Sequence, residues 1–445
     1  MSYIKDFEDS RLMEEIGVED IESLFSDIPE EAHIDGLDLP DGLPEWELKR
    51  KMDGILAANR TMLSFLGGGA YQHHIPTAVG SILSRGEFFT SYTPYQPEIS
   101  QGMLQSIFEY QSQICELTGM EVSNASLYDA STGLGEAALM SSRISRKTEF
   151  IIPAAIAPEK KNVLHNYIKG AGMTFREVPF DPTTGQMDID ALKEMVSDAT
   201  AGVYIESPNY FGVLEESVPT IKELLPKKTL LTVGINPISL GIIEPPGNFG
   251  ADIVIGDGQP LGIPVSLGGP YVGIFAARKK AARKMPGRVI GMTRDSQGDR
   301  AFAMTLMTRE QHITRERATS NICSNQALCA LAAGVYLALA GRSGLRTIAL
   351  INLRNAHHLA AKLNNIPGVT APMMASPFFN EFTVKFDNAK AVDLREALVK
   401  QGIEPGIPLA SRFPGIDDAM IISTTEVHTS EDHDRLVGAI REYLS

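Results

Sequence analysis

The sequence predicts a large α/β protein in which helices cover both faces of a mostly parallel sheet. Two observations indicate this fold class. Short apolar segments with the length of buried strands recur between residues 150 and 277, and helical segments separate several of them. The 445 residues are 43% hydrophobic and 21% charged, which suits a globular protein of two or three domains.

Residues 1–60 are expected to form an N-terminal helical arm. It contains the acidic stretch EDSRLMEEIGVEDIESLFSDIPEE, in which four apolar side chains recur at helical spacing: Ile21, Leu24, Phe25 and Ile28. A single apolar stripe buries little surface on its own. We therefore expect the arm to pack on the body of the protein or on a partner chain.

Residues 61–325 are expected to form a large domain. An ordered loop region rich in Gly, Pro, Tyr and Phe covers 61–100, an amphipathic helix then ends at Gly119, and another helix begins near Ser131. The expected strands lie at 150–154, 174–180, 202–207, 230–235, 252–257 and 271–277, with helices at 158–172, 188–198 and 220–226.

Residues 326–445 are expected to form a small C-terminal α+β domain. An apolar helix at 325–341 links the domains and a second helix follows at 345–366. The remaining candidate elements are 381–386, 393–403, 419–428 and 431–444.

Charge and composition exclude several classes of protein. The net charge of −15 argues against nucleic acid or an anionic membrane as the main partner, because both repel an acidic surface. We see no signal peptide and no stretch of about 18 apolar residues, so we expect a protein of the reducing cytosol that does not span a membrane. The three cysteines are too scattered for zinc, and neither histidine pair, at 73–74 or 357–358, has metal-ligand spacing, so we expect no metal.

The loop after the expected strand at 252–257 raises a specific question. A strand end that leads into a loop is where an α/β enzyme usually keeps its chemistry. This loop contains no lysine, histidine or cysteine, and its polar residues are Asp257, Gln259 and Ser266.

The segment DASTGLGEAAL is a candidate anion site. Ser131, Thr132 and Gly133 lie where a helix is expected to begin, and the free amides and positive dipole of a helix start favour phosphate or carboxylate. A plain N-cap with Glu136 near the helix start is the alternative interpretation.

The segment TSYTPYQPEISQG is a candidate binding surface. Tyr92 and Tyr95 offer rings and hydroxyls, Gln96 and Gln101 offer amides, and Glu98 is a possible base. The prolines make the backbone rigid, so a purely structural turn is the alternative.

The segment TREQHITRERATSNICSNQAL is a third candidate. Arg309, Arg315 and Arg317 could hold a carboxylate, and His312 could titrate near neutral pH. An exposed charged helix followed by a capped turn explains the same pattern.

Long blocks of the chain resemble the glycine-cleavage P-protein family, the pyridoxal-phosphate (PLP) glycine decarboxylases. They include TSYTPYQPEISQGMLQSIFEYQSQICELTGMEVSNASLYDASTGLGEA, IIEPPGNFGADIVIGDGQPLGIPVSLGGPYVGIFAARKK and PGRVIGMTRDSQGDRAFAMTLMTREQHITRERATSNICSNQAL. The resemblance covers nearly the whole chain. The chain's length resembles that of the alpha subunit in organisms that divide the enzyme into two chains.

The resemblance implies PLP fold type I, with a mainly parallel seven-stranded sheet and a small C-terminal domain. It also implies that Gln259 occupies the position of the lysine that forms the Schiff base. An amide cannot form that imine, because its nitrogen lone pair is delocalised. Asn236 or a neighbour lies where active members place an aspartate against the pyridinium nitrogen. We therefore expect a vestigial cofactor site around Ser131, Thr132, Gly133 and Asn236.

The resemblance further implies a partner. A beta subunit would bind PLP covalently, an alpha2beta2 heterotetramer would decarboxylate glycine, and the aminomethyl group would pass to the lipoyl arm of H-protein. This chain would line the partner's site, and our candidates for that role are Thr93, Tyr95, Gln96, Glu98, Arg309, His312 and Asn321.

Two other hypotheses stay open from the sequence. The chain could be a non-catalytic scaffold that only stabilises the beta subunit. It could also be a self-sufficient PLP enzyme with a displaced lysine, for which Lys169, Lys279 and Lys280 are the candidates.

Overall fold

The computed structural model describes residues 10–34, 36–323 and 326–445. The chain divides into two compact units, Met1–Arg60 and Thr61–Ser445. The two units are described separately below.

The first unit consists of short helices joined by extended segments. They are α1 (Ser10–Ile16), the 3-10 turns η1 (Glu22–Phe25) and η2 (Glu30–Ala32), and α2 (Glu45–Leu56). The expected apolar stripe from Ile21 to Ile28 therefore spans one short 3-10 turn and its flanks instead of an α-helix. Its four apolar side chains are exposed.

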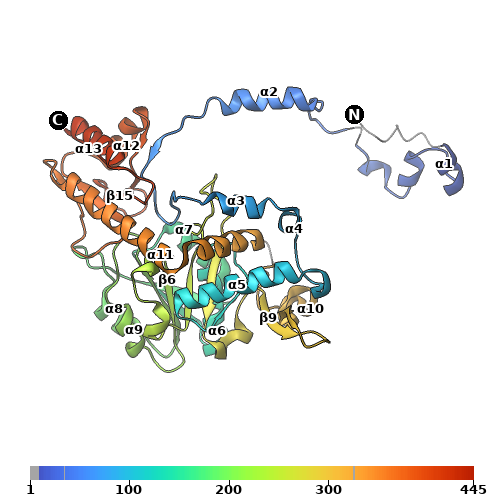
Figure 1. Cartoon of the computed structure of the whole chain (residues 1–445), viewed down its shortest axis with the longest axis horizontal. Helices are drawn as coiled ribbons and strands as arrows, with labels where there is room; N and C mark the ends of the chain where they lie inside the picture. Colours follow the sequence, from blue (N-terminus) through green and yellow to red (C-terminus); the bar gives the residue numbers. More distant parts are fainter. Residues whose placement is uncertain (1–9, 35, 324–325) are drawn as a thin grey trace. The chain divides into compact units, whose positions relative to one another are not determined.

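The second unit is built on a mixed seven-stranded sheet in the order β2-β8-β7-β6-β5-β3-β4 (Figure 1). β3 to β7 pair in parallel, and β8 runs antiparallel to both β7 and β2. The expected mainly parallel seven-stranded sheet is confirmed. The strands are β2 (Val122–Ser123), β3 (Glu149–Pro153), β4 (Thr174–Val178), β5 (Thr200–Ser207), β6 (Leu230–Ile235), β7 (Ile253–Asp257) and β8 (Gly273–Ala277).

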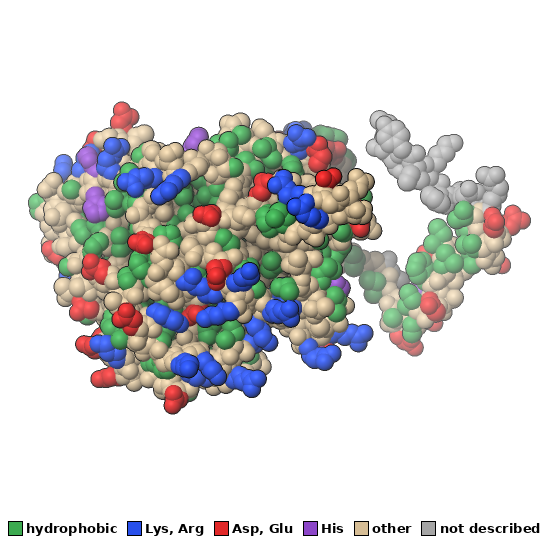
Figure 2. Space-filling view, turned by 60° about the horizontal axis from the view of Figure 1, so that its bottom comes forward, with side chains coloured by type: hydrophobic (Ala, Val, Ile, Leu, Met, Phe, Trp, Pro, Cys, Tyr) green, Lys and Arg blue, Asp and Glu red, His purple; other side chains and the backbone are tan. Residues whose placement is uncertain are grey.

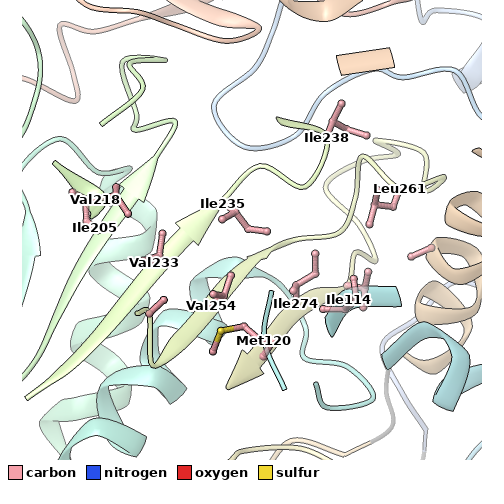
Figure 3. Packing of buried hydrophobic residues seen from close by; sticks show 14 of the residues in the cluster. Ile114, Met120, Ile205, Val218, Val233, Ile235, Ile238, Val254, Leu261 and Ile274 are labelled. Atoms are coloured by element: carbon pink, nitrogen blue, oxygen red, sulfur yellow. The ribbon is translucent and has the colours of Figure 1, made fainter. Parts of the chain in front are cut away.

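Alternating side chains along each strand contact different helix layers, because successive residues of a strand point to opposite faces. Ile205, Val233 and Val254 belong to a core that also includes residues of α5 (Gln101–Thr118), α8 (Ile189–Met195) and α9 (Val218–Leu224) (Figure 3). Ile152, Tyr204 and the other alternate strand residues pack with α6 (Ala130–Ser145) and α7 (Pro158–Lys169). Burial of the sheet on both faces is therefore confirmed.

The C-terminal part contains a four-stranded sheet in the order β11-β12-β15-β14. The strands are β11 (Val369–Thr370), β12 (Glu381–Phe386), β14 (Ile407–Pro408) and β15 (Ala419–Ser423), and the helices α12 (Ala391–Lys400) and α13 (Ser430–Leu444) pack with them. A two-residue strand from the loop region, β1 (Leu63–Ser64), pairs with β13 (Ile403–Glu404). The proposed boundary between residues 325 and 326 stays a prediction.

Two features differ from the expected elements. The segments β9 (Val289–Arg294) and β10 (Arg300–Thr305) form an antiparallel hairpin that the sequence patterns did not indicate. The two expected helices after residue 325 form one long element, α11 (Ala327–Asn364), with non-helical backbone at Gly341, where φ is 58°.

Within the described residues, α11 is the one helix whose length and hydropathy would suffice to cross a membrane. Its alanines and Tyr336 pack in the main core, and Leu359 and Leu363 pack in the core of the C-terminal sheet. It also lies beside α5 (Figure 1). These contacts identify α11 as the core helix that joins the two sheets.

The loop region at 61–100 contains short helices. They are α3 (Thr77–Leu83), α4 (Gly86–Phe89) and η3 (Pro97–Ile99). This region places its first loop, Gly67 to Tyr71, over the carboxyl end of the large sheet, where Tyr71 contacts Gln259.

Candidate functional site

The main candidate site is a cavity of about 350 Å³ at the carboxyl ends of β5, β6 and β7. Parallel sheets concentrate ligand sites at this end. The strand ends contribute Glu206, Asn236 and Asp257, and the C-terminal part contributes Glu381 and Arg412. The start of α6 and the loop from Gly67 to Tyr71 complete the wall.

Gln259 is buried beside this cavity, and its side-chain amide is fully engaged. Its Oε1 accepts a hydrogen bond from the Tyr71 backbone N–H at 2.8 Å. Its Nε2 donates to the backbone oxygens of Tyr71 at 2.9 Å and Ile263 at 2.8 Å. Gln259 therefore joins the strand-end loop to the loop at 67–71, and both N–H groups of its amide are already used.

Two carboxylates occupy the start of α6. Asp129 is the N-cap residue, and its Oδ1 accepts the Thr132 backbone N–H at 2.7 Å. Asp257 Oδ2 accepts the backbone N–H of Ala130 at 3.4 Å. The helix start that favours an anion thus already holds two carboxyl groups of the chain itself. Ser131, Thr132 and Gly133 lie in the first turn as expected, but the capping side chain is Asp129.

Glu381 is a second buried carboxyl group on the cavity wall. It accepts hydrogen bonds from the Gly68 backbone N–H and from the Tyr71 hydroxyl, the latter at 2.9 Å. Burial raises the pKa of Glu381 to about 7, and it also raises the pKa of Asp257 to about 7. Both groups therefore sit in surroundings that penalise their negative charge.

The cations on the cavity wall are already paired. Lys160 forms an ion pair with Glu206. Arg412 pairs with Glu159 at 2.7 Å and lies over the ring of Tyr210, 5.8 Å from its centroid. Neither cation remains to neutralise a phosphate without breaking one of these pairs.

Asn236 follows β6 on the cavity wall and is nearly buried. Its Oδ1 accepts the backbone N–H of Ile238 at 3.0 Å, and its Nδ2 lies 3.4 Å from Oδ1 of Asn380. It turns the chain after the strand and offers no negative charge to a cationic ring.

The residues of this cavity do not fit PLP. Gln259, which we expect at the lysine position, is bound to backbone through its amide, the helix start carries carboxyl groups where a phosphate would bind, and Asn236, which we expect near the ring nitrogen, carries no charge. Among the described lining residues Lys160 is the single lysine, and its ammonium group is held by Glu206.

The three lysines considered for a displaced Schiff base lie elsewhere. Lys169 contacts Asn166 on the exposed face of α7. Lys279 and Lys280 lie in the exposed turn η6 (Lys279–Lys284). None of the three lines the cavity in the described part of the chain.

A second cluster lies around Arg288, which is buried at the start of the β9–β10 hairpin. Its guanidinium donates to Glu310 at 2.9 Å, to the Tyr95 hydroxyl at 2.6 Å and to the Thr93 hydroxyl at 3.2 Å. His312 packs edge-on against Tyr95, with ring centroids 5.6 Å apart. The structure thus joins Thr93 and Tyr95 to His312, although more than 200 residues separate them in the sequence.

The other predicted residues lie outside this cluster of contacts. Gln96, Glu98 and Asn321 are exposed. Arg309 donates to the backbone oxygens of Met285, Gly287 and Leu306, so its guanidinium anchors a turn. None of the seven predicted wall residues lines the strand-end cavity, so this chain contains two separate candidate regions.

Sequence reasoning missed the residues that organise both regions. Arg288 lies at the end of a basic run, a pattern that is typical of a solvated face. Glu310 is surrounded in the sequence by basic residues, so the sequence did not indicate that it forms a buried ion pair. Asp129 and Glu381 belong to no sequence motif that we recognised as part of a site. The position of Glu310 between Arg309 and His312 was the available signal for a buried ion pair.

The fold defines the class of the protein, which is fold type I of the PLP-dependent enzymes. Solved structures of the class share the architecture at low sequence identity. A sphingosine-1-phosphate lyase from Burkholderia pseudomallei has a TM-score of 0.66 at 16% identity, with 93% and 94% of the two chains covered.

The sequence identifies the family within that class. The family model of the glycine cleavage system P-protein matches residues 3–440, so this chain belongs to that family. A crystal structure of glycine decarboxylase (P-protein) in inhibitor-bound form matches with a TM-score of 0.90 and 36% identity over 99% of each chain.

Relatives in other organisms have matching lengths. The probable glycine dehydrogenase (decarboxylating) subunit 1 of Moorella thermoacetica is 44% identical over 98% of each chain. The protein of the same name from Thermococcus onnurineus is 45% identical over 97% of this chain and 96% of its own.

Proposed function

We propose that this chain is the lysine-less subunit of a two-subunit glycine decarboxylase. The observation that carries the proposal is Gln259, whose amide stands at the lysine position and spends all its hydrogen bonds on the backbone of Tyr71 and Ile263. The relatives named subunit 1 support a chain that works with a second subunit.

In this proposal the beta subunit binds PLP covalently and this chain does not. The complex is an alpha2beta2 heterotetramer in the cytoplasm. It decarboxylates glycine and transfers the aminomethyl group to the lipoyl arm of H-protein. The carboxylates at the start of α6 and the paired cations of the cavity support the absence of PLP from this chain.

The second cluster supports a further role as part of the wall of the partner's site. Tyr95 and the side chain of His312 are each close to half exposed, while Arg288 beneath them is buried. An aromatic and imidazole surface held from below by an ion pair is rigid enough to position a substrate. Gln96, Glu98 and Asn321 are proposed as exposed members of the same wall.

The test combines the purified chain with the second subunit and H-protein. The chain alone, supplied with PLP, should bind none covalently and should show no glycine–bicarbonate exchange. Exchange should appear on addition of the second subunit. Exchange by this chain alone, or a pyridoxyl label on any of its lysines after borohydride reduction, contradicts the proposal.

The same assay distinguishes a wall role from a purely stabilising scaffold. Tyr95→Phe and His312→Gln leave the Arg288–Glu310 pair in place; Tyr95→Phe also removes one hydrogen-bond acceptor of Arg288, so assembly of the complex is measured alongside its kinetics. A wall role predicts a changed kcat or KM for glycine in a normally assembled complex. Unchanged kinetics favour the scaffold.

A further inference from the structure

A second cavity lies at the opposite end of the large sheet from the strand-end cavity. It measures about 470 Å³ and lies between the turn after α9 and the turn η6, across the starts of β6 and β7. β6 begins here at Leu230 and ends at Ile235 on the strand-end cavity, so roughly 17 Å of strand separates the two. None of the described residues lines both cavities.

Basic side chains dominate the wall of this second cavity, which we call the basic groove. One of its lining residues, Asp252, is acidic, and six are basic: Lys222, Lys227, Lys228, Arg278, Lys280 and Lys284. Residues 61–445 as a whole contain 38 acidic and 34 basic side chains. Figure 2, which turns the lower side of Figure 1 toward the reader, shows Lys and Arg side chains gathered on the lower half of that face. The groove is therefore a local centre of positive charge on an acidic molecule, and it attracts anions.

The single acidic side chain of the groove does not neutralise this charge. Asp252 forms an ion pair with Lys222 and accepts the backbone N–H of Leu231 at 3.0 Å, and its second oxygen lies 3.9 Å from Nζ of Lys280. The other three lysines of the wall form no ion pair with an acidic side chain in the part of the chain that the structure describes: Lys227, Lys228 and Lys284. These three ammonium groups are available to an anionic ligand.

The turn that carries two of these lysines is anchored to the sheet. The Thr229 N–H donates to the backbone oxygen of Pro226 at 3.0 Å, and its hydroxyl donates to the backbone oxygen of Thr200 at the start of β5, at 2.9 Å. Lys228 between them has a φ of 74°, in the left-handed region that a lysine adopts only at an energetic cost. The backbone of the turn is therefore ordered before a ligand arrives, which lowers the entropic cost of binding.

The floor of the basic groove is apolar. Leu230 and Ala281 are buried, and Ile144, Leu225 and Pro226 are half-buried, whereas the three unpaired lysines are exposed. An apolar cavity with a few charged groups that fix the orientation of a ligand is typical of a small-molecule site. The groove therefore suits a ligand that combines negative charge with an apolar part.

The type of cation favours phosphate over carboxylate. The guanidinium of Arg278 donates to the backbone oxygens of Ala251 and Gly247, so the unpaired cations of the groove are all lysines. Arginine binds a carboxylate through two parallel hydrogen bonds, whereas the ammonium group of lysine is a point charge that suits phosphate. Several ammonium groups around one cavity match a ligand that carries several phosphate charges.

We propose that the basic groove binds an organic polyphosphate, a small molecule with linked phosphate groups on an apolar ring system. The unpaired lysines hold the phosphate groups, and the ring system lies on the apolar floor. A ligand that binds the folded chain in this way also stabilises it by mass action. The proposal concerns a site separate from the strand-end cavity, and it does not depend on the proposed function.

Titration calorimetry on the full-length chain, in buffer without divalent metal, tests the proposal. Adenosine triphosphate (ATP) should bind with a stoichiometry of one per chain. Inorganic tripolyphosphate, which lacks the ring system, should bind several-fold more weakly than ATP, and inorganic phosphate at least tenfold more weakly. A change from 50 mM to 0.5 M NaCl should weaken ATP binding several-fold, because salt screens the lysines.

Matched variants locate the site. The triple variant Lys227→Gln, Lys228→Gln and Lys284→Gln should weaken ATP binding tenfold or more. The control variant removes the same charge from three other exposed lysines and should leave the affinity unchanged: Lys169→Gln, Lys390→Gln and Lys400→Gln. Leu225→Ala should weaken the binding of ATP but not that of tripolyphosphate. Thermal unfolding without ligand checks that each variant is folded.

Each alternative ligand gives a different result. Citrate that binds as tightly as tripolyphosphate would show that the groove responds to charge alone. A hexaglutamate peptide that binds more tightly than ATP would identify a docking surface for an acidic protein, and an RNA oligonucleotide that does so would identify a nucleic-acid surface. Equal ATP affinity in the two triple variants would place the binding elsewhere. Each of these results, or the absence of ATP binding, overturns the proposal, whereas a loss confined to the groove variant supports it.

Discussion

The side chain of Gln259 and the backbone of Tyr71 exchange two hydrogen bonds, 2.8 and 2.9 Å long, like neighbouring residues of a β-ladder. This contact joins the strand-end loop to a segment 188 residues earlier in the chain. The position at which the resemblance to the family leads us to expect a lysine therefore has a structural role here.

Gln259→Lys is expected to destabilise the chain without creating a cofactor site. The substitution removes the acceptor of the Tyr71 N–H and buries an ammonium group, which costs about 2–4 kcal/mol of unfolding free energy. Urea unfolding measures this loss, and Gln297→Lys on the surface is the control. A stable variant that forms a reducible imine with pyridoxal phosphate contradicts the expectation.

The buried carboxyl groups predict a pH dependence of stability. The pKa of Asp257 and that of Glu381 are each raised to about 7, so the folded state binds their protons more tightly than the unfolded state. Their contribution is therefore largest below pH 4 and falls as the pH rises from about 4 to 7. Above pH 7 it stays at its lower value.

Glu381→Gln should remove part of this dependence. The amide keeps an acceptor for the Gly68 N–H and cannot ionise. The free energy of unfolding of the variant should therefore exceed that of the wild type by about 1–3 kcal/mol between pH 5 and pH 8. Denaturation at several pH values measures the difference. Glu223→Gln on the surface should leave the slope unchanged, and an equal slope in Glu381→Gln would show that Glu381 does not titrate in this range.

Arg288 is expected to hold the second cluster together. Arg288→Met removes the guanidinium partner of Glu310 and leaves only His312 nearby, at 3.5 Å, so it should lower the free energy of unfolding by about 3–5 kcal/mol. The double variant Arg288→Met with Glu310→Met should recover more than half of that loss, which a double-mutant cycle of unfolding free energies measures. Additive losses would show that the two side chains are not coupled.

Gly212→Ala should disturb the strand that carries Glu381. A Cβ at this position would lie 1.9 Å from the backbone oxygen of Glu381, and φ is +84°. Gly298 has a similar φ of +90° with open space around it, so Gly298→Ala measures the backbone strain alone. We expect Gly298→Ala to lower the free energy of unfolding by about 1 kcal/mol and Gly212→Ala to lower it by at least twice as much, as measured by thermal unfolding.

The regular elements were predictable because each depends on a local pattern. The strands β5 to β8 are largely apolar and buried, and α5 ends just before Gly119, whose φ of 68° suits glycine. The β9–β10 hairpin was missed because its outer residues are charged or exposed, and the buried run that marks the other strands is absent.

The site was predictable only in part. The blocks shared with the P-protein family led to Gln259 and to the start of α6. They did not reveal that Asp129, Asp257 and Glu381 surround one cavity, because these carboxyl groups come from segments more than 100 residues apart that only tertiary structure brings together. The contacts of Arg288 with Thr93 and Tyr95 could not be predicted either, because these residues lie far apart in the sequence.

The two hydrogen bonds between Gln259 and Tyr71 would, on the proposed function, make this chain hard to convert into one that holds its own coenzyme. A lysine at position 259, introduced by a single codon change, would remove the hydrogen bonds that join this loop to the loop at 67–71. The acidic side chains at the start of α6 would remain. Recovery of a working coenzyme centre would require coordinated replacement of at least the amide and the two aspartates. On the proposed function, substitutions that adjust this chain to the second subunit are therefore easier to acquire than the set that would let it bind its own coenzyme.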